Sequence, residues 1–244
     1  MAGVELINRF KELYLRQQFH PTLLGVFISP FYLARNALVN AIKAESHVIE
    51  GRILDVGCGK KPYQDIFRFT EYVGLEFDTP ENRALKAADY FYDGNRFPFT
   101  DGSFDSVICN EVLEHVFNPQ DFLMEIRRVL KSEGTLLLTV PFVWDEHEQP
   151  YDFGRYTSFG LRYLLNNAGL PVVKLVKTCP GWAAIFQLIN AHIFKLTVTK
   201  NAYLNLFATV FLMSPFSLVG LLISNINVQH EDFYLDNLVI CTKT

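Results

Sequence analysis

Short apolar runs alternate with amphipathic stretches along most of the chain. The runs end at glycine or at other turn residues, as buried strands do, and the stretches between them carry apolar positions at helical spacing. Seven strands are expected, at residues 53–56, 72–76, 87–91, 104–109, 135–140, 172–178 and 237–242. This alternation predicts an α/β fold, with a doubly wound, mostly parallel sheet covered by helices on both faces.

Helix signals are clearest around the fifth strand. Asn118 and Pro119 stand where an N-cap and a first helical residue are expected, and the helix they begin is predicted to reach Lys131. A further helix is predicted from Thr157 to Gly169. One short helix is also expected between the first two strands.

Two segments fall outside the alternation. Residues 1–50 are expected to form an N-terminal helical extension, and residues 181–230 an apolar helical insertion before the last strand. The remaining residues, 51–180 and 231–244, would form the domain that contains the sheet. The sequence therefore predicts one α/β domain with two helical additions.

The insertion contains an unusually apolar run. Residues 201–230 include no Asp, Glu, Lys or Arg, and the run from Tyr203 to Ile223 is long enough to cross a bilayer. A single crossing, however, would separate the last strand from its sheet. Three interpretations stay open: a buried or dimer-forming helical subdomain, a surface that lies on or dips into a membrane, and a true span.

Composition excludes several classes of protein. The 244 residues include 22 basic and 26 acidic ones, for a net charge of −4, and no basic cluster suits a nucleic-acid backbone. Charges at Glu5, Arg9 and Lys11 interrupt the apolar run that a secretory signal would need. The 4 cysteines form no C-x-x-C pair, so we expect free thiols in a cytoplasmic protein.

The first expected strand ends in a glycine turn that suits a bound cofactor. In Leu54-Asp55-Val56-Gly57-Cys58-Gly59, the glycines allow a ligand to approach the backbone closely. A dinucleotide fingerprint would need a third glycine where Pro62 stands, and the phosphate-binding loop signature is absent as well. Glu76 ends the next strand, where a carboxylate can bind both hydroxyls of a ribose.

Four sequence blocks, in this order and at these spacings, resemble the class I S-adenosylmethionine-dependent methyltransferases, in particular the type 11 subgroup. The blocks are ILDVGCGKKPY, YVGLEFD, YDGNRFPFTDGSFDSVICNEVLEHV and RRVLKSEGTLLLTVP. The resemblance implies a Rossmann-like methyltransferase fold and S-adenosyl-L-methionine as the cofactor. The cofactor-binding residues that it implies are Asp55, Gly57 and Gly59 at the amino-acid end, Glu76 on the ribose, Asp78, Asp93 and Gly94 at the adenine, and Asn110 facing the methionine portion.

Acceptor chemistry is expected in the polar residues 145–156, which follow the fifth strand. Here His147 has the side chain whose usual pKa of about 6.5 suits proton removal at neutral pH. Glu148 or Asp152 could orient it, and Arg155 could hold an anionic group. Alternatively, the segment is a polar surface loop in which an Arg–Asp pair fixes the next helix. We expect no metal, since methyl transfer requires none.

Two other features refine the expected function. The Glu114-His115 pair lies in a run that the family carries across unrelated substrates, which implies a structural role on a short helix. The segment Lys60-Lys61-Pro62 and a His-Glu…Pro…Asp…Arg-Tyr-Thr pattern resemble members associated with surface-glycan and lipid-linked saccharide modification. We therefore expect O-methylation of a small-molecule, saccharide or lipid-linked acceptor near the cytoplasmic membrane face, with the insertion as a peripheral membrane contact or a homodimer contact.

Two alternatives from other classes stay open. One is a soluble methyltransferase of a small aromatic or quinone-like metabolite, in which the insertion is the substrate pocket. The other is a non-catalytic S-adenosylmethionine-binding or membrane-interaction protein.

Overall fold

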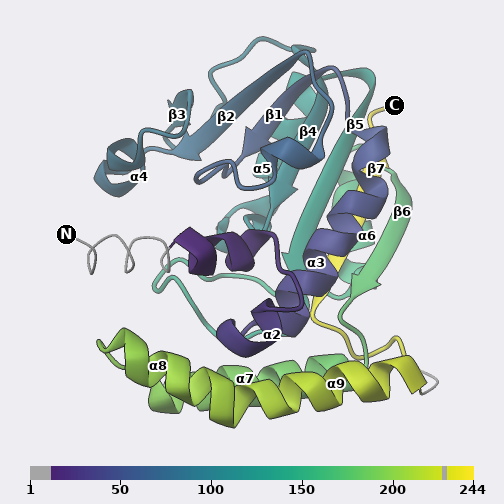
Figure 1. Cartoon of the computed structure of the whole chain (residues 1–244). Coiled ribbons are helices and arrows are strands. Elements are labelled where there is room, and N and C mark those ends of the chain that lie inside the picture. The colour runs from purple at the N-terminus through teal and green to yellow at the C-terminus, as the bar shows by residue number, and fades with distance from the viewer. Residues whose placement is uncertain (1–11, 227–229) are drawn as a thin grey trace. The chain divides into compact units, whose positions relative to one another are not determined.

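The computed structural model describes residues 12–226 and 230–244. The chain divides into two compact units, Met1–Ala41 with Lys177–Leu235, and Ile42–Val176 with Asp236–Thr244 (Figure 1). The first unit is helical and the second contains the sheet. The N-terminal extension and the insertion, expected as separate additions, thus fall largely into one unit.

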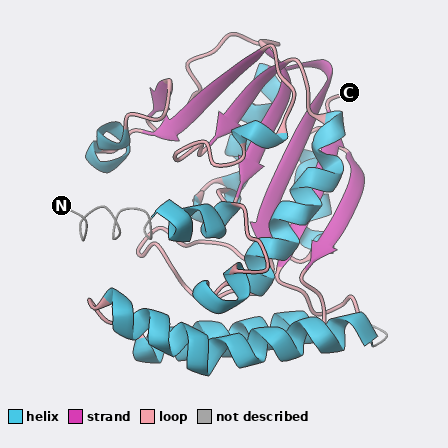
Figure 2. Ribbon diagram, viewed as in Figure 1, coloured by secondary structure: helices cyan, strands magenta, loops and turns pink. Residues whose placement is uncertain are grey.

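Seven strands form a single sheet in the order β3-β2-β1-β4-β5-β7-β6 (Figure 2). Strand β1 pairs in parallel with β2 and β4, β2 with β3, and β4 with β5, whereas β7 is antiparallel to β5. The bounds are β1 Arg52–Val56, β2 Glu71–Phe77, β3 Tyr90–Tyr92, β4 Phe104–Asn110, β5 Leu130–Pro141, β6 Val172–Thr178 and β7 Asp236–Thr242. The predicted fold class is confirmed. The strand order changes direction between β1 and β4, which is where open α/β sheets bind ligands.

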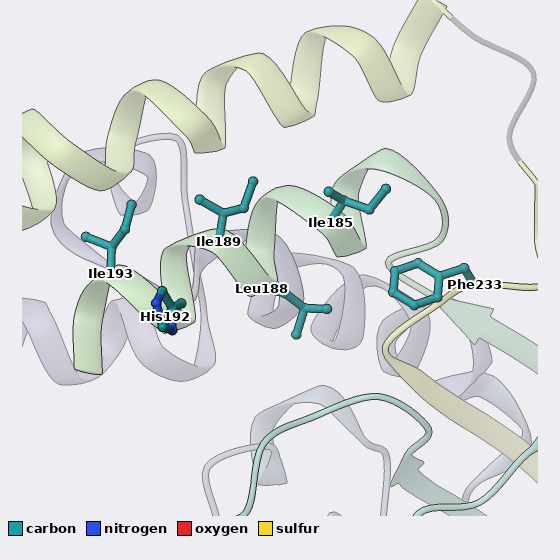
Figure 3. Close-up of a pocket in the computed structure, with 6 residues that line it drawn as sticks. All are labelled: Ile185, Leu188, Ile189, His192, Ile193 and Phe233. Atoms are coloured by element: carbon teal, nitrogen blue, oxygen red, sulfur yellow. The ribbon is translucent and has the colours of Figure 1, made fainter. Parts of the chain in front are cut away.

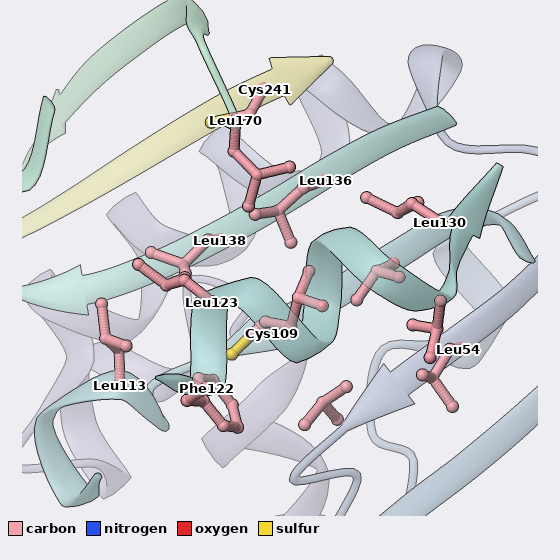
Figure 4. Close-up of a cluster of buried hydrophobic side chains, with 14 of the residues drawn as sticks. Leu54, Cys109, Leu113, Phe122, Leu123, Leu130, Leu136, Leu138, Leu170 and Cys241 are labelled. Atoms are coloured by element: carbon pink, nitrogen blue, oxygen red, sulfur yellow. The ribbon is translucent and has the colours of Figure 1, made fainter. Parts of the chain in front are cut away.

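Apolar side chains of the strands pack against the helix α5, Pro119–Val129 (Figure 4). Its buried residues Phe122, Leu123, Ile126 and Val129 recur at helical spacing, so one face of α5 is covered. Burying a side chain of this size contributes about 1.5–3 kcal/mol, which makes this layer a main source of the unit's stability.

The other helices of this unit and its short turns differ in part from the sequence prediction. They are α3 Tyr32–Glu45, which begins in the helical unit, α4 Pro80–Leu85, α6 Ser158–Asn167, and 3₁₀ turns at Ser46–Val48, Gln64–Ile66 and Leu113–His115. The helix expected between the first two strands is only the turn Gln64–Ile66, and α4 was not predicted. As predicted, Thr157 caps α6, where its hydroxyl accepts the N–H of Gly160 at 3.1 Å.

Helix α5 ends earlier than predicted. It stops at Val129 rather than Lys131, because Leu130 pairs with Phe104 and begins β5 five residues before the expected start. Asn118 precedes α5 as expected, but its side chain makes no capping hydrogen bond. Pairing with a neighbouring strand has overridden the local helix signals here.

Buried amides hold the helical unit together. Its elements are α2 Gly25–Ile28, α7 Trp182–Thr197, α8 Ala202–Ala208, the π-helical turn Thr209–Met213 and α9 Ser214–Ile226. Gln187 of α7 donates to the carbonyl of Pro30 at 3.1 Å and accepts the N–H of Ala34 at 3.2 Å. Asn190, also on α7, donates to Ser217 of α9 at 2.9 Å. Since a buried amide without a partner is costly, these bonds fix the N-terminal segment and α9 to α7.

Helices α8 and α9 form one long apolar helix with the π-helical turn between them. Within the described residues, Ala202–Ser224 is the one helix long and apolar enough to cross a membrane, with 23 residues and a mean hydropathy of 2.2. Only 33% of its most apolar window is buried. Tyr203, Phe207, Phe211 and Leu222 are each more than half exposed, so a large apolar surface faces outward.

Candidate active site

The chain turns sharply after β1, and the turn requires glycine. Gly57 and Gly59 have φ values of 70° and 50°, which favour glycine, and the Gly57 N–H donates to the carbonyl of Leu75 at 2.9 Å. A Cβ on Gly57 would lie 2.3 Å from Cγ2 of Val112, whereas nothing lies within 4 Å of the corresponding position on Gly59. The glycine loop therefore packs on the segment after β4 and leaves open space beside Gly59.

Glu76 of β2 reaches back to this loop. Its Oε2 accepts the N–H of Gly59 at 2.9 Å, and its Oε1 accepts the N–H of Phe77 at 3.0 Å. The side-chain amide of Asn82 also donates to Oε1, at 3.3 Å. Oε2 keeps an acceptor position for a ribose hydroxyl, and a second hydroxyl can replace the long Asn82 bond at Oε1. The structure thus brings Glu76 to the glycine loop, as the ribose-binding role requires.

Asp55 lies within β1 and is 6% exposed. Its Oδ2 accepts the hydroxyl of Tyr72 at 2.7 Å. Burial raises the pKa of Asp55 to about 7, although the Tyr72 hydrogen bond opposes this shift. Tyr72 is not among the residues predicted from the sequence, because a diagonal neighbour on the adjacent strand cannot be identified before the register is known.

Burial of Asp55 predicts a pH-dependent stability in the cofactor-free protein. As pH rises from about 4 to about 7, the unfolded carboxyl ionises while the folded one stays protonated, so wild type loses stability in this window and loses no more above it. We expect the free energy of unfolding of Asp55→Asn, relative to wild type, to increase across the window by no more than about 4 kcal/mol. Urea denaturation of both proteins at several pH values measures this change. A difference that stays constant with pH would contradict it.

The expected adenine-side acids are exposed and form local hydrogen bonds. The Asp78 carboxylate pairs with the guanidinium of Arg83, which lowers the pKa of Asp78. Asp93 accepts the backbone and side-chain N–H groups of Asn95 at 3.0 and 3.1 Å. Gly94 has a φ of 93°. In the cofactor-free protein, Asp78 and Asp93 are thus ionised and close to solvent.

Asn110 is the last residue of β4, and its Oδ1 accepts the hydroxyl of Thr139 on β5 at 3.4 Å. The first six residues after β4 connect the glycine loop with residues 145–156. Val112 contacts Gly57, as described above, and the carbonyl of Glu114 accepts the N–H groups of Phe153 and Gly154 at 2.8 and 3.1 Å. The polar loop is therefore tied to the segment that borders the cofactor site.

Arg155 is committed to the loop itself. Its five N–H groups have five acceptors: both carboxylate oxygens of Asp152 at 2.6 and 2.7 Å, and the carbonyls of Trp144, Asp145 and Gly154. In this arrangement every N–H of Arg155 has an acceptor within the loop, and its role in holding an anionic group stays a prediction. Arg155 fixes the loop, which is the alternative that the sequence left open.

His147 and Asp152 lie together, as predicted. The backbone N–H of His147 donates to Oδ2 of Asp152 at 2.9 Å. Nδ1 of the His147 ring is 3.4 Å from the same oxygen. The Arg155 hydrogen bonds lower the pKa of Asp152 to about 2, so this carboxyl stays ionised beside the ring. Glu148 does not contact His147 in this way: its Oε2 is 3.8 Å from Nε2 of His115 and its side chain is 73% exposed.

Glu114 and His115 lie beside the polar loop, on the short turn where they were expected. Glu114 is 1% exposed, its Oε2 has no hydrogen-bond partner, and burial raises its pKa to about 8. One ligand atom from each of Glu114, His115 and His147 lies within 4.8 Å of the others. From the sequence, Glu114 and His115 are expected to have a structural role and no metal is expected, because the convergence depends on contacts between segments about thirty residues apart.

The cysteines fit the expectation of free, packed thiols. All four lie within the described residues, are buried and form no disulfide. Val56 and Cys109 are register partners, so Cys58 and Cys109 lie at neighbouring strand ends. Burial raises the pKa of Cys58 to about 12, which keeps this thiol protonated and unreactive at neutral pH.

Comparisons with known proteins agree with this geometry. Residues 54–138 match the methyltransferase domain family. An uncharacterized methyltransferase of Mycobacterium sp. (strain KMS) is 36% identical over 99 residues, which are 38% of this chain and 39% of the relative. The chain spans less than half the length of the curated relatives it matches.

Two solved structures share the fold. An S-adenosylmethionine-dependent methyltransferase from Mesorhizobium loti has a TM-score of 0.55 and 13% identity, over 86% of this chain and 100% of that one. A phosphoethanolamine N-methyltransferase of Haemonchus contortus, in complex with S-adenosyl-L-methionine, has a TM-score of 0.53 and 17% identity, over 93% of this chain and 59% of that one.

The cofactor of the matched family fits the residues present. Open space lies beside Gly59, and Glu76 offers unused acceptor capacity at the glycine loop. The chain therefore carries a class I methyltransferase domain of the type 11 subgroup, whose cofactor is S-adenosylmethionine.

Proposed function

We propose that the protein transfers a methyl group from S-adenosylmethionine to a hydroxyl of a saccharide or lipid-linked acceptor at the cytoplasmic face of a membrane. The observation that carries the O-methylation is the position of His147, in a loop hydrogen-bonded to the turn that follows β4. That turn begins next to Val112, which contacts Gly57 of the cofactor loop. A proton acceptor thus lies in the loop that borders the cofactor site.

The cofactor is held at the carboxyl ends of β1, β2 and β4. Glu76 binds the ribose hydroxyls, the Gly57–Gly59 turn lets the methionine portion approach the backbone, and Asp55 lies at its amino-acid end. When bound, S-adenosylmethionine supplies a methyl group whose bond to the sulfonium sulfur breaks as its bond to the acceptor oxygen forms, leaving S-adenosylhomocysteine. The residues of the chain align acceptor and methyl group and exclude water.

The acceptor proton is the part of the reaction that the polar loop handles. His147 takes the hydroxyl proton at a ring nitrogen as the new C–O bond forms, a contribution of about 10²- to 10⁴-fold. The ionised carboxylate of Asp152 stabilises the resulting imidazolium, and Arg155 keeps that carboxylate in place. Arg155 is therefore a positioning residue.

The membrane location is supported by the exposed apolar surface of α8 and α9. Monomeric soluble proteins rarely expose apolar patches of this extent without a function. No charged residue interrupts residues 201–230, and Lys200 precedes them, where a cation favours an anionic lipid surface. This pattern suits a helix lying in the membrane interface.

Hydrogen bonds at the base of the insertion argue against a single crossing. The N–H of Leu235 donates to the carbonyl of Thr178 at 3.1 Å, and that of Gly181 to Phe233 at 2.7 Å. The chain thus enters and leaves the insertion at one place, and β7 then pairs with β5. One crossing would put these partners on opposite sides of the bilayer, so we propose a surface contact.

An apolar hollow on α7 supports a lipid-linked acceptor (Figure 3). It has a volume of about 480 Å³ and is lined by Ile185, Leu188, Ile189, His192, Ile193 and Phe233. Of these residues, only His192 carries a polar side-chain atom. A hollow of this composition suits a hydrocarbon chain better than a sugar.

The function is tested by supplying S-adenosylmethionine with a labelled methyl group and a bacterial lipid extract that contains lipid-linked saccharides. We expect label in the organic phase with wild type and at least a 100-fold lower rate with His147→Ala, whose binding of S-adenosylhomocysteine should be unchanged. Transfer to a soluble phenol without lipid would favour the small-aromatic alternative. No transfer to either, with the cofactor bound, would favour a non-catalytic protein.

Membrane contact has its own prediction. Phe207 and Phe211 are 60% and 61% exposed on the long apolar helix. Because charges there must stay in water, we expect Phe207→Glu with Phe211→Glu to abolish flotation with liposomes that contain anionic lipid. The control is Phe159→Glu, since Phe159 is 83% exposed on α6 of the other unit and should leave flotation unchanged. A wild-type protein that dimerises and does not float would show that the surface is a subunit contact.

A further inference from the structure

Glu114, His115 and His147 form a cluster of three potential metal ligands, in which His147 is not the one ionisable group. Glu114 and His115 belong to the 3₁₀ turn after β4, and His147 belongs to the loop after β5. The rings of His115 and His147 meet edge to face, with centroids 4.8 Å apart. Their ligand atoms and a carboxylate oxygen of Glu114 all lie within 4.8 Å of one another.

The hydrogen bonding of His115 determines which of its ring nitrogens has a lone pair available to a ligand. Its Nδ1 is 2.7 Å from the carbonyl oxygen of Tyr151, and since a carbonyl only accepts, Nδ1 carries the hydrogen. In the neutral ring, Nε2 therefore has a free lone pair. A backbone carbonyl on the other ring nitrogen is the arrangement that orients metal-binding histidines in proteins.

Acceptor atoms converge on that nitrogen. Nε2 of His115 is 3.8 Å from Oε1 of Glu114 and 3.8 Å from Oε2 of Glu148. These distances are too long for direct hydrogen bonds, and the other Glu114 oxygen is buried without a partner. A cation placed among these acceptor atoms would be bound by all of them at once, with the proton of Glu114 released on binding.

We propose that Glu114, His115 and His147 bind a divalent transition-metal cation, with Glu148 able to complete the site. Two imidazoles with one or two carboxylates are the ligand set of Zn²⁺, Mn²⁺ and Fe²⁺ sites. Ligands about 2.1 Å from a metal in a tetrahedral site lie about 3.4 Å apart, so ligand atoms now up to 4.8 Å apart approach by about 1.4 Å on binding. The Glu148 side chain is 73% exposed, so it has room to turn toward the cation.

The cation would also activate the acceptor hydroxyl for methyl transfer. This part of the inference rests on the proposed function. Held by Glu114, His115 and His147, the cation would make a hydroxyl in its open coordination position more acidic, and would so ease loss of that proton to solvent beside the exposed Glu148 side chain. His147 is then a metal ligand, and proton removal no longer depends on its free ring. Cation binding itself does not rest on the proposed function.

The test is Co²⁺ binding by chelator-treated protein without a polyhistidine tag. We expect visible absorption bands of bound Co²⁺, at one ion per chain, that disappear when Zn²⁺ displaces it. Glu114→Gln and His115→Ala should each weaken Co²⁺ binding at least tenfold. The control His47→Ala should leave it unchanged, because His47 is an exposed histidine whose Nδ1 also meets a backbone carbonyl, at 3.0 Å.

Calorimetric titration with S-adenosylhomocysteine accompanies each measurement. Wild type that binds S-adenosylhomocysteine but not Co²⁺ would overturn the metal site and leave the proposed function intact. Wild type that binds Co²⁺ but not S-adenosylhomocysteine would do the reverse. If His115→Ala loses both ligands through misfolding, Glu114→Gln decides, since it is isosteric; Co²⁺ binding as tight as wild type in this variant would also overturn the inference.

Discussion

Glu76→Ala should bind S-adenosylhomocysteine at least about tenfold more weakly than wild type. Hydrogen bonds to a charged group contribute about 1.5–3 kcal/mol, and 1.4 kcal/mol corresponds to a factor of ten. The Glu76 carboxylate also accepts the N–H of Gly59, so its removal loosens the turn that the cofactor approaches. Calorimetric titration of both proteins measures the change.

A matched control lies at the other end of the same strand. Glu71 begins β2, is 57% exposed and pairs with Arg52 at 2.6 Å. Glu71→Ala should bind S-adenosylhomocysteine as wild type does, because Glu71 lies at the start of β2, whereas the glycine loop lies beside the end of that strand. If Glu76→Ala and wild type bound S-adenosylhomocysteine with equal affinity, Glu76 would not bind the ribose. The assignment of the cofactor pocket would then be wrong.

Local sequence signals were sufficient to predict the strands of the sheet, but not the residues at which each strand begins and ends. The apolar run 104–109 and the turn before it define β4 from sequence, since a buried parallel strand needs little else. The start of β5 was predicted five residues late, because Leu130 is drawn into the sheet by Phe104, a partner 26 positions earlier. Helix and strand signals compete at such a boundary, and tertiary pairing decides between them.

The candidate site shows the same division. The glycine turn directly follows β1 and Glu76 lies near the end of β2, so a local sequence motif identifies both. The role of Arg155 depends on how its own loop folds, because that loop supplies its acceptors. The role of His115 depends on Tyr151, 36 positions away. Residue types predicted that the polar loop carries chemistry, but which of its groups are free could be learned only from the structure.

Gly57→Ala should cost about 2–5 kcal/mol of stability, among the largest effects of any single methyl group in this domain. The left-handed backbone costs a residue with a side chain about 1–2 kcal/mol, and forcing a methyl group to 2.3 Å from Cγ2 of Val112 adds about 1–3 kcal/mol. Urea denaturation measures the loss. Gly59→Ala is the matched control, since Gly59 has a similar φ but open space, and it should lose only the backbone contribution.

A double-mutant cycle separates the two causes. Adding Val112→Ala to Gly57→Ala removes the clash and should restore about 1–3 kcal/mol beyond the effect of Val112→Ala alone, leaving the strain of the backbone. If instead the two substitutions were additive, the glycine loop would not rest on the segment after β4. The contact between Gly57 and Val112 links the cofactor loop to the turn that bears Glu114 and His115, so additivity would also separate the cofactor site from the proposed acceptor loop.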